Sequence, residues 1–216
     1  MTLKNLLPAL LLLVAACQPT PPERLPYLGE RDVRANPNGG PADTIYASAP
    51  AFRLVNQDGQ RISNADFGGR LYLTDFFFAT CPGICPKVQS EMLKVYQETA
   101  ADDRLRFVSF TIDPAHDTVP VLRTYAQKLG VPDASKWHFA TFASANRDSV
   151  FALAKAYFTA AQPETGAPGG FAHAGNFALI DDQGHIRGLY DSLNKDEMLR
   201  LRRDLPLLLA ELAGRK

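Results

Sequence analysis

The stretch Phe76–Val88, FFFATCPGICPKV, places two cysteines directly after an apolar run. Three residues separate Cys81 from Cys85, and a proline follows each of them. Thiols at such a spacing can form a reversible disulfide or can act as two soft ligands for one metal ion. Both cysteines belong to a turn rich in Pro and Gly rather than to the apolar run itself, which disfavours a role as inert buried thiols.

The residues around the pair predict how the two thiols are held. The dipeptide Pro82-Gly83 favours a turn, which can bring the two Cα atoms into the disulfide range of about 4.4–6.8 Å. A helix is expected from Pro86 to Ala100, and its N-terminus should lower the pKa of at least one thiol. Thioredoxin-like oxidoreductases have two intervening residues. Three intervening residues leave room for both sulfur atoms to face one Cu(I) or Zn(II) ion.

Four histidines are available as further ligands. His116 lies in a polar loop and is expected to be solvated or to cap the next helix. His185 lies in a polar turn and is expected to be solvated, whereas His138 opens a short strand and is expected to pack. His173 follows the Gly/Pro-rich loop 161–170 and precedes a strand, at the end of the sheet where we place the cysteines. A mobile loop that brings one imidazole to a rigid pair of thiols could load and release an ion, so His173 is the candidate third ligand.

The elements that position these residues alternate along the chain. Strands are predicted at Leu71–Phe78, Leu105–Ile112 and His138–Phe142, helices at Pro86–Ala100, Val119–Leu129, Asn146–Phe158 and Lys195–Leu212, and hairpins within 51–63 and 176–191. Alternating strands and helices indicate parallel pairing, and the last hairpin adds antiparallel strands. We therefore predict an α/β, thioredoxin-like fold over residues 45–216. It has a mixed central sheet flanked by helices, an N-terminal hairpin and a C-terminal hairpin plus helix.

The first residues are typical of a processing signal. Lys4 precedes the apolar run Leu6–Ala16, which is too short to span a bilayer, and VAAC resembles a bacterial lipobox. We expect residues 1–16 to be a lipoprotein signal peptide and Cys17 to be lipid-modified, with residues 17–44 as an extended, poorly ordered tether. An ordinary secretory signal is the alternative. Lipidation would leave Cys81 and Cys85 as each other's only partners in a compartment that tolerates disulfides.

The charge balance restricts the partners. The chain has 23 basic and 23 acidic residues, and cleavage after residue 16 removes one lysine, which gives 22 against 23 and a net charge of −1. Such a chain has no electrostatic footprint for nucleic acid. Membrane attachment should therefore come from acyl chains on Cys17, with the domain facing the periplasm. The sequence has no coiled-coil seam, so we expect a monomer.

Taken together, three segments make the chain resemble the Sco/SenC family of copper-binding thioredoxin-like proteins. They are FFFATCPGICP, TIDPAHDTVPVLRTYAQKLGV and GFAHAGNFALIDDQGHIRGLYD, and the resemblance runs from about Ala51 to the C-terminal helix. Two departures stand out. The family often has DHS around the histidine where this chain has AHA, which removes an acidic neighbour that could orient the ring. Many members also use a transmembrane helix as anchor, where this chain has a lipobox.

The resemblance implies that Cys81, Cys85 and His173 bind copper, as Cu(I) held by two thiolates and an imidazole, with Cu(II) left open. It further implies a role in delivering copper to, or reducing the cysteines of, the copper centre of a respiratory cytochrome c oxidase. Our leading hypothesis is a copper chaperone that transfers its ion by ligand exchange, without catalytic turnover. The implied partner is a copper-accepting oxidase subunit or another copper protein.

An enzymatic function is the alternative. A thiol–disulfide oxidoreductase would use Cys81 and Cys85 to reduce target cysteines, and His173 would be dispensable. A peroxidase of the peroxiredoxin type is less favoured, because Thr80 adjoins Cys81 directly and the T-x-x-C arrangement is missing.

Overall fold

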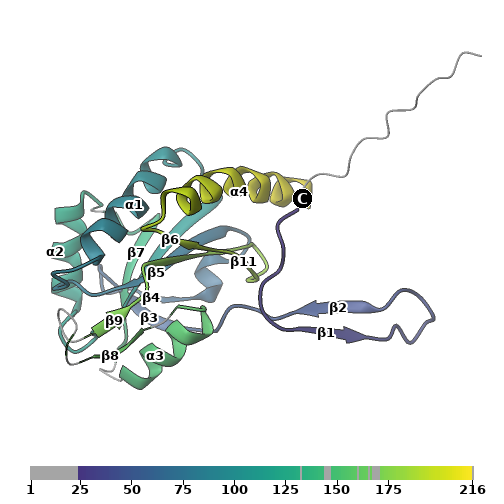
Figure 1. Ribbon diagram of the computed structural model, residues 1–216, viewed down its shortest axis with the longest axis horizontal. Helices are drawn as coiled ribbons and strands as arrows, with labels where there is room; N and C mark the ends of the chain where they lie inside the picture. Colours follow the sequence, from purple (N-terminus) through teal and green to yellow (C-terminus); the bar gives the residue numbers. More distant parts are fainter. Residues whose placement is uncertain are drawn as a thin grey trace, which may run out of the picture.

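The structure is a computed structural model, and it describes residues 24–131, 133–143, 147–159, 161–164, 166 and 171–215 (Figure 1). For residues 147 and 171–173 it describes the backbone and not the side chain. The predicted signal peptide and Cys17 lie outside the described residues. None of the described helices is long and apolar enough to cross a membrane.

A seven-stranded sheet in the order β11-β10-β5-β6-β7-β3-β4 forms the centre of the molecule. Its strands are β3 (Arg53–Asn56), β4 (Arg61–Ser63), β5 (Leu71–Phe77), β6 (Leu105–Thr111), β7 (Trp137–Thr141), β10 (Asn176–Ile180) and β11 (Ile186–Asp191). The pairs β5–β6 and β6–β7 are parallel, and the other neighbours are antiparallel. The mixed sheet and both of the predicted hairpins are thus confirmed.

Helices cover both faces of this sheet. They are α1 (Cys85–Glu98), α2 (Val119–Leu129), α3 (Arg147–Ala156) and α4 (Lys195–Gly214), with a short 3-10 helix η1 (Asn64–Phe67). Successive side chains of β5 point to opposite faces: the ring of Phe77 packs on Tyr125 of α2, and the ring of Phe76 packs on Tyr157 after α3. Helix α4 lies beside α1 (Figure 1). The arrangement confirms the predicted α/β, thioredoxin-like fold.

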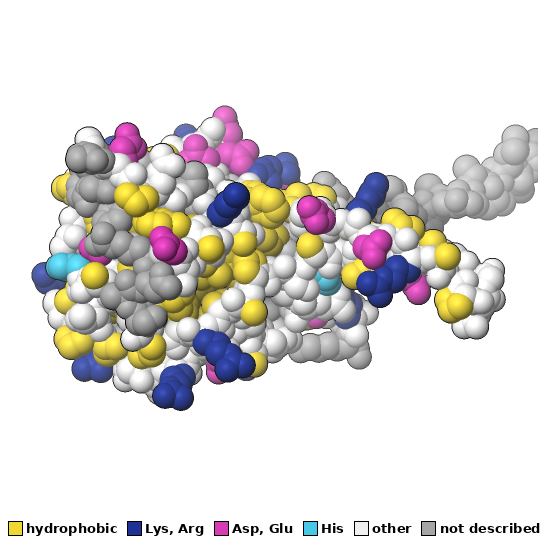
Figure 2. Space-filling view, turned by 90° about the horizontal axis from the view of Figure 1, so that it is seen from below, with side chains coloured by type: hydrophobic (Ala, Val, Ile, Leu, Met, Phe, Trp, Pro, Cys, Tyr) yellow, Lys and Arg dark blue, Asp and Glu magenta, His cyan; other side chains and the backbone are white. Residues whose placement is uncertain are grey.

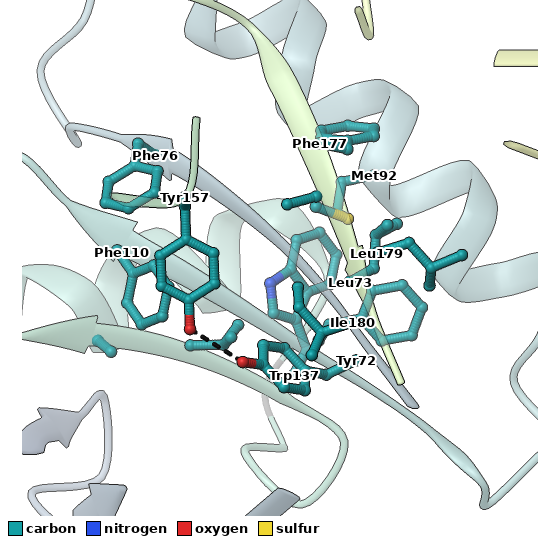
Figure 3. Packing of buried hydrophobic residues seen from close by; sticks show 14 of the residues in the cluster. Tyr72, Leu73, Phe76, Met92, Phe110, Trp137, Tyr157, Phe177, Leu179 and Ile180 are labelled. Atoms are coloured by element: carbon teal, nitrogen blue, oxygen red, sulfur yellow. Dashed lines mark hydrogen bonds between the residues drawn. The ribbon is translucent and has the colours of Figure 1, made fainter. Parts of the chain in front are cut away.

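The core is rich in aromatic side chains that lie between the sheet and its helices (Figure 3). Trp137 is fully buried and stacks on Phe139 with ring centroids 5.0 Å apart. Burying a phenol requires a partner for its hydroxyl, and the hydroxyls of Tyr72 and Tyr157 supply one another at 2.9 Å. This core fixes β5, the strand that leads into the cysteine turn.

The segment that we predicted to be a tether contains paired strands. β1 (Arg31–Arg34) and β2 (Asp43–Tyr46) form an antiparallel hairpin that stands out from the body of the molecule (Figures 1 and 2). Its strands are almost entirely exposed, and they include Val33 at 60% and Ile45 at 42% exposure. Because neither strand buries a face, the sequence lacks the apolar alternation by which strands are recognised.

Residues 25–28, which we call the strap, bind to the edge of the sheet beside β11. Leu28 N donates to Ile186 O at 2.8 Å. The guanidinium of Arg187 donates to Leu25 O and Pro26 O at 2.6 and 3.1 Å, and it lies 4.0 Å from the centre of the Tyr27 ring. The described chain therefore begins attached to the domain rather than as a free tether.

Candidate metal centre

The cysteine turn joins β5 to α1, as the sequence predicts. After Phe77 the chain turns, with Cys81 N donating to Phe78 O at 3.2 Å. Cys85 is the first residue of α1, and Pro86 follows it at a position where the helix needs no N–H donor. Cys81 is partly exposed, whereas Cys85 is buried at 1% exposure. Both cysteines are present as thiols.

The electrostatics of Cys85 differ from the sequence-based expectation. Burial raises the pKa of the Cys85 thiol, and its hydrogen bond with Cys81 raises that pKa further. The pKa of Cys85 is therefore not the lowered one that the sequence predicts for at least one of the two thiols, because loss of solvent outweighs the helix N-terminus. The same hydrogen bond shows that the two thiols are adjacent. A soft cation between them would replace protons and supply the positive charge that the buried thiolate lacks.

A buried carboxyl group of β5 lies near enough to Cys85 to raise its pKa, and sequence reasoning missed it. Asp75 of β5 accepts hydrogen bonds from Gln89 Nε2 at 2.6 Å and from Ser109 Oγ at 2.5 Å, and Trp137 Nε1 donates to Ser109 Oγ at 3.0 Å. Burial raises the pKa of Asp75 to about 7. The presence of an acidic residue within the apolar run of β5 could have indicated this buried carboxyl group.

Asp117 fixes the chain just before the cysteines. Its carboxylate is buried and accepts from Ala79 N at 3.0 Å and from Thr111 Oγ1 at 2.5 Å. His116 Nδ1 lies 2.9 Å from the second oxygen of the same carboxylate, and this hydrogen bond raises the pKa of His116. The polar loop DPAHDT thus positions the cysteine turn in addition to preceding α2.

The histidine segment returns to the start of α1. β9 (Phe171–His173) pairs with β8 (Ala161–Pro163), with His173 opposite Ala161. Two residues later, Gly175 packs so closely on α1 that an added β-carbon would lie 2.8 Å from Val88 Cγ2. The imidazole of His173 lies outside the described side chains. Its backbone, however, belongs to a segment that passes beside the helix beginning at Cys85.

The other histidines lie in three different environments. His116 is about half exposed, in accord with the expected solvation. His138 is packed, with Nδ1 at 3.3 Å from Asn56 Nδ2, and burial lowers its pKa. His185 was expected in solvent and is instead covered by the strap, where the ring of Tyr27 lies 5.2 Å away. The described side chains contain no cluster of three His, Cys, Asp or Glu residues that could hold a metal ion.

Fold and site together define a thioredoxin-like protein with a pair of adjacent thiols where the central strand meets its helix. The sequence profile of the SCO1/SenC family matches residues 42–202. The chain belongs to the SCO1/SenC family.

Several relatives support the assignment. A protein of Stutzerimonas stutzeri assigned as copper-binding is 33% identical over 145 residues, which cover 64% of this chain and 67% of that protein. The SCO1 protein homolog of Bacillus subtilis is 26% identical over 152 residues, covering 70% and 77%.

Solved structures agree in fold. A SCO1/SenC family lipoprotein from Bacillus anthracis superposes with a TM-score of 0.65 at 26% identity, covering 75% of this chain and 95% of that one. Arabidopsis thaliana ScoI with copper bound has a TM-score of 0.60 at 17% identity, covering 74% and 99%. Because the Arabidopsis thaliana protein is only 17% identical to this chain, its similarity shows a shared fold and nothing more.

Proposed function

We propose that this protein is a copper chaperone that binds Cu(I) through Cys81, Cys85 and His173 and supplies it to the copper centre of a respiratory cytochrome c oxidase. The observation that carries the proposal is the adjacency of the Cys81 and Cys85 thiols at the start of α1. The family supports it: one relative is assigned as copper-binding, and a structural relative, BsSco, is described as a member of the Sco family of cytochrome c oxidase assembly proteins.

The three proposed ligands suit a copper ion that must be bound and later transferred to another protein. Two thiolates and one imidazole match the soft character of Cu(I). The thiol of Cys85 keeps its proton when no cation is present, because burial raises its pKa. Binding should therefore release protons and weaken in acid. Incoming thiolates of an acceptor could replace the ligands one at a time, so transfer needs no catalytic turnover.

We further propose that the chain is a lipoprotein anchored through Cys17 and facing the periplasm. The support is the lipobox-like VAAC together with a structural relative described as a SCO1/SenC family lipoprotein. Expression with radiolabelled palmitate tests this: the parent should be labelled and a Cys17→Ser variant should not.

A thiol–disulfide oxidoreductase is the second candidate. One cysteine is partly exposed and the other is buried, which is the arrangement of an attacking thiol and a resolving thiol. The structural relative BsSco is described as containing a disulfide switch. Rapid catalytic reduction of insulin by this protein would favour the enzyme over the chaperone.

Anaerobic titration of the reduced protein with Cu(I), read by X-ray absorption, tests the main proposal. We expect about one ion per chain with two sulfur ligands and one nitrogen ligand, and no binding once the two thiols are oxidised to a disulfide. His173→Ala should weaken binding while leaving disulfide formation intact. His185→Ala removes a histidine beside the strap, away from the cysteine turn, and is the matched control. If His173→Ala bound copper as tightly as His185→Ala, the three-ligand site would be wrong.

A further inference from the structure

A surface groove of about 660 Å³ lies beside the cysteine turn, between α1 and α2. Its lining includes Thr80 and Pro86 from around the cysteines and Val121, Tyr125 and Leu129 from α2. Exposed residues also line it, among them Thr124 and Lys128. The groove is therefore open along α2, and a chain segment could lie in it with one end next to Cys81.

The charged groups of the groove have one sign. Lys128 and His116 line it, and no carboxylate is among its described lining residues. The nearest acidic group on that loop, Asp117, is buried behind His116 and is already paired with Ala79 N and Thr111 Oγ1. A ligand that complements this lining combines apolar side chains with a carboxylate.

Gln89 of α1 also lines the groove. It is fully buried, and its Nε2 donates to Asp75. Its Oε1 has no hydrogen-bond donor among the residues that the structure describes, and it is enclosed. Recognition of a bound segment would therefore depend on the apolar lining and on Lys128.

We propose that this groove binds an extended segment of the protein that receives the copper, a segment that flanks the target cysteine and carries apolar side chains followed by a carboxylate. The inference rests on the proposed function in that the target presents a thiol to this site. The segment would hold the target thiol next to Cys81, the more exposed of the two cysteines. Lys128 would select the carboxylate, and the apolar lining of α2 would select the side chains before it.

Equilibrium disulfide exchange tests the groove without any metal. The full chain carrying Cys17→Ser and Cys85→Ser keeps Cys81 as its single thiol. It is mixed with acetyl-Cys-Gly-Leu-Leu-Glu-amide, supplied as the disulfide with 2-mercaptoethanol, in excess 2-mercaptoethanol. The Cys81 thiolate attacks the peptide sulfur and releases mercaptoethanol thiolate, and intact mass gives the conjugated fraction. Two matched peptides replace Glu by Lys, or both Leu by Ser.

We expect the Leu-Leu-Glu peptide to form its conjugate about fivefold more favourably than either matched peptide, the size of one good surface interaction. Lys128→Glu should reverse the preference between Glu and Lys. Arg123→Glu, an equal change of charge on α2 outside the groove lining, should not. Thr124→Arg should lower conjugation of the Leu-Leu-Glu peptide by obstructing the groove.

Several outcomes would overturn the proposal. Equal conjugation of the three peptides would show that the groove selects nothing. A preference for Leu without one for Glu would indicate a general apolar site, and an equal response to Arg123→Glu and Lys128→Glu would indicate an effect of net charge. Failure of the copper proposal is measured separately, in the Cu(I) titration, because the exchange contains no metal.

Discussion

Gly175 and Val88 are in close contact, and this contact joins the histidine segment to the helix that begins at Cys85. A β-carbon on Gly175 would lie 2.8 Å from Val88 Cγ2 and 3.2 Å from Ser192 Oγ. The carbonyl of Gly175 is held by Ser192, which donates from N at 3.0 Å and from Oγ at 2.5 Å. The glycine is needed for close approach, so its replacement should displace the segment carrying His173.

Gly175→Ala should weaken Cu(I) binding about tenfold, which corresponds to about 1.4 kcal/mol, because the added methyl group pushes the histidine segment away from α1. Competition with a Cu(I) chelator measures the affinity. The double variant Gly175→Ala/Val88→Ala restores space at Val88 and should recover most of the affinity. Equal affinities of the parent and the single variant would argue against this coupling.

Asp75 should make stability depend on pH. Burial raises its pKa from 3.8 to about 7, so the folded state retains a proton that the unfolded chain releases near pH 3.8. The contribution is full below about pH 4 and is lost as the pH rises toward 7. The total loss is on the order of 4 kcal/mol, at 1.36 kcal/mol per pKa unit.

Asp75→Asn removes this titration. Relative to the parent, the metal-free reduced variant should gain stability as the pH rises from 4 to 7, because its amide carries no charge at any of these values. Urea unfolding at pH 5, 6, 7 and 8 measures the difference. Parallel pH profiles of the parent and the variant would mean that Asp75 keeps an ordinary pKa in the folded protein.

Arg187 of β11 should be the residue on which attachment of the strap depends most. Its fully buried side chain pairs with Asp181 at 3.0 Å and with Glu211 at 2.9 Å. Arg187→Met leaves the strap carbonyls without this donor and breaks both buried ion pairs, at a cost of about 3–5 kcal/mol. Each carboxylate keeps another donor, His185 N for Asp181 and Arg215 for Glu211. Urea unfolding measures the loss, and tryptic cleavage after Arg31 should accelerate. Arg203→Met, at a side chain 64% exposed, is the control and should change stability little.

Tyr157→Phe should destabilise the protein by about 1 kcal/mol, because it leaves the buried hydroxyl of Tyr72 without its partner at 2.9 Å. Thermal unfolding of the two single variants and of Tyr72→Phe/Tyr157→Phe measures their coupling. If the losses in the single variants simply add in the double variant, the two hydroxyls do not interact.

Local signals account for what the sequence predicts well. Helix α2 has the predicted bounds, because Pro120 lies in its first turn and Gly130 ends it at φ 86°. The turn between β5 and α1 follows in the same way from Pro82 and Gly83. The sequence is a weaker guide to features that depend on contacts between residues far apart in the chain. The contact between Gly175 and Val88, the carboxyl of Asp75 and the raised pKa of Cys85 depend on packing across the sheet.

The structure of residues 24–46 also could not be predicted from local sequence patterns. β1 and β2 are polar and exposed, so no apolar periodicity reveals them. The strap depends on Arg187, about 160 positions along the chain from its carbonyl partners. A basic residue within the apolar strand β11 was the sole local signal of that contact, and it does not identify the partner.

The strap and the cysteines lie at opposite ends of β5. The strap lies beside the turn after β10, where Ile180 pairs with Tyr72 near the start of β5, whereas the cysteines follow the far end of that strand. The two ends are about 20 Å apart, the length of a seven-residue strand. If Cys17 carries the proposed lipid, the seven residue steps from Cys17 to Arg24 reach at most about 25 Å. The lipid would then hold the strap end of the domain near the bilayer, and an acceptor could meet Cys81 from the aqueous side.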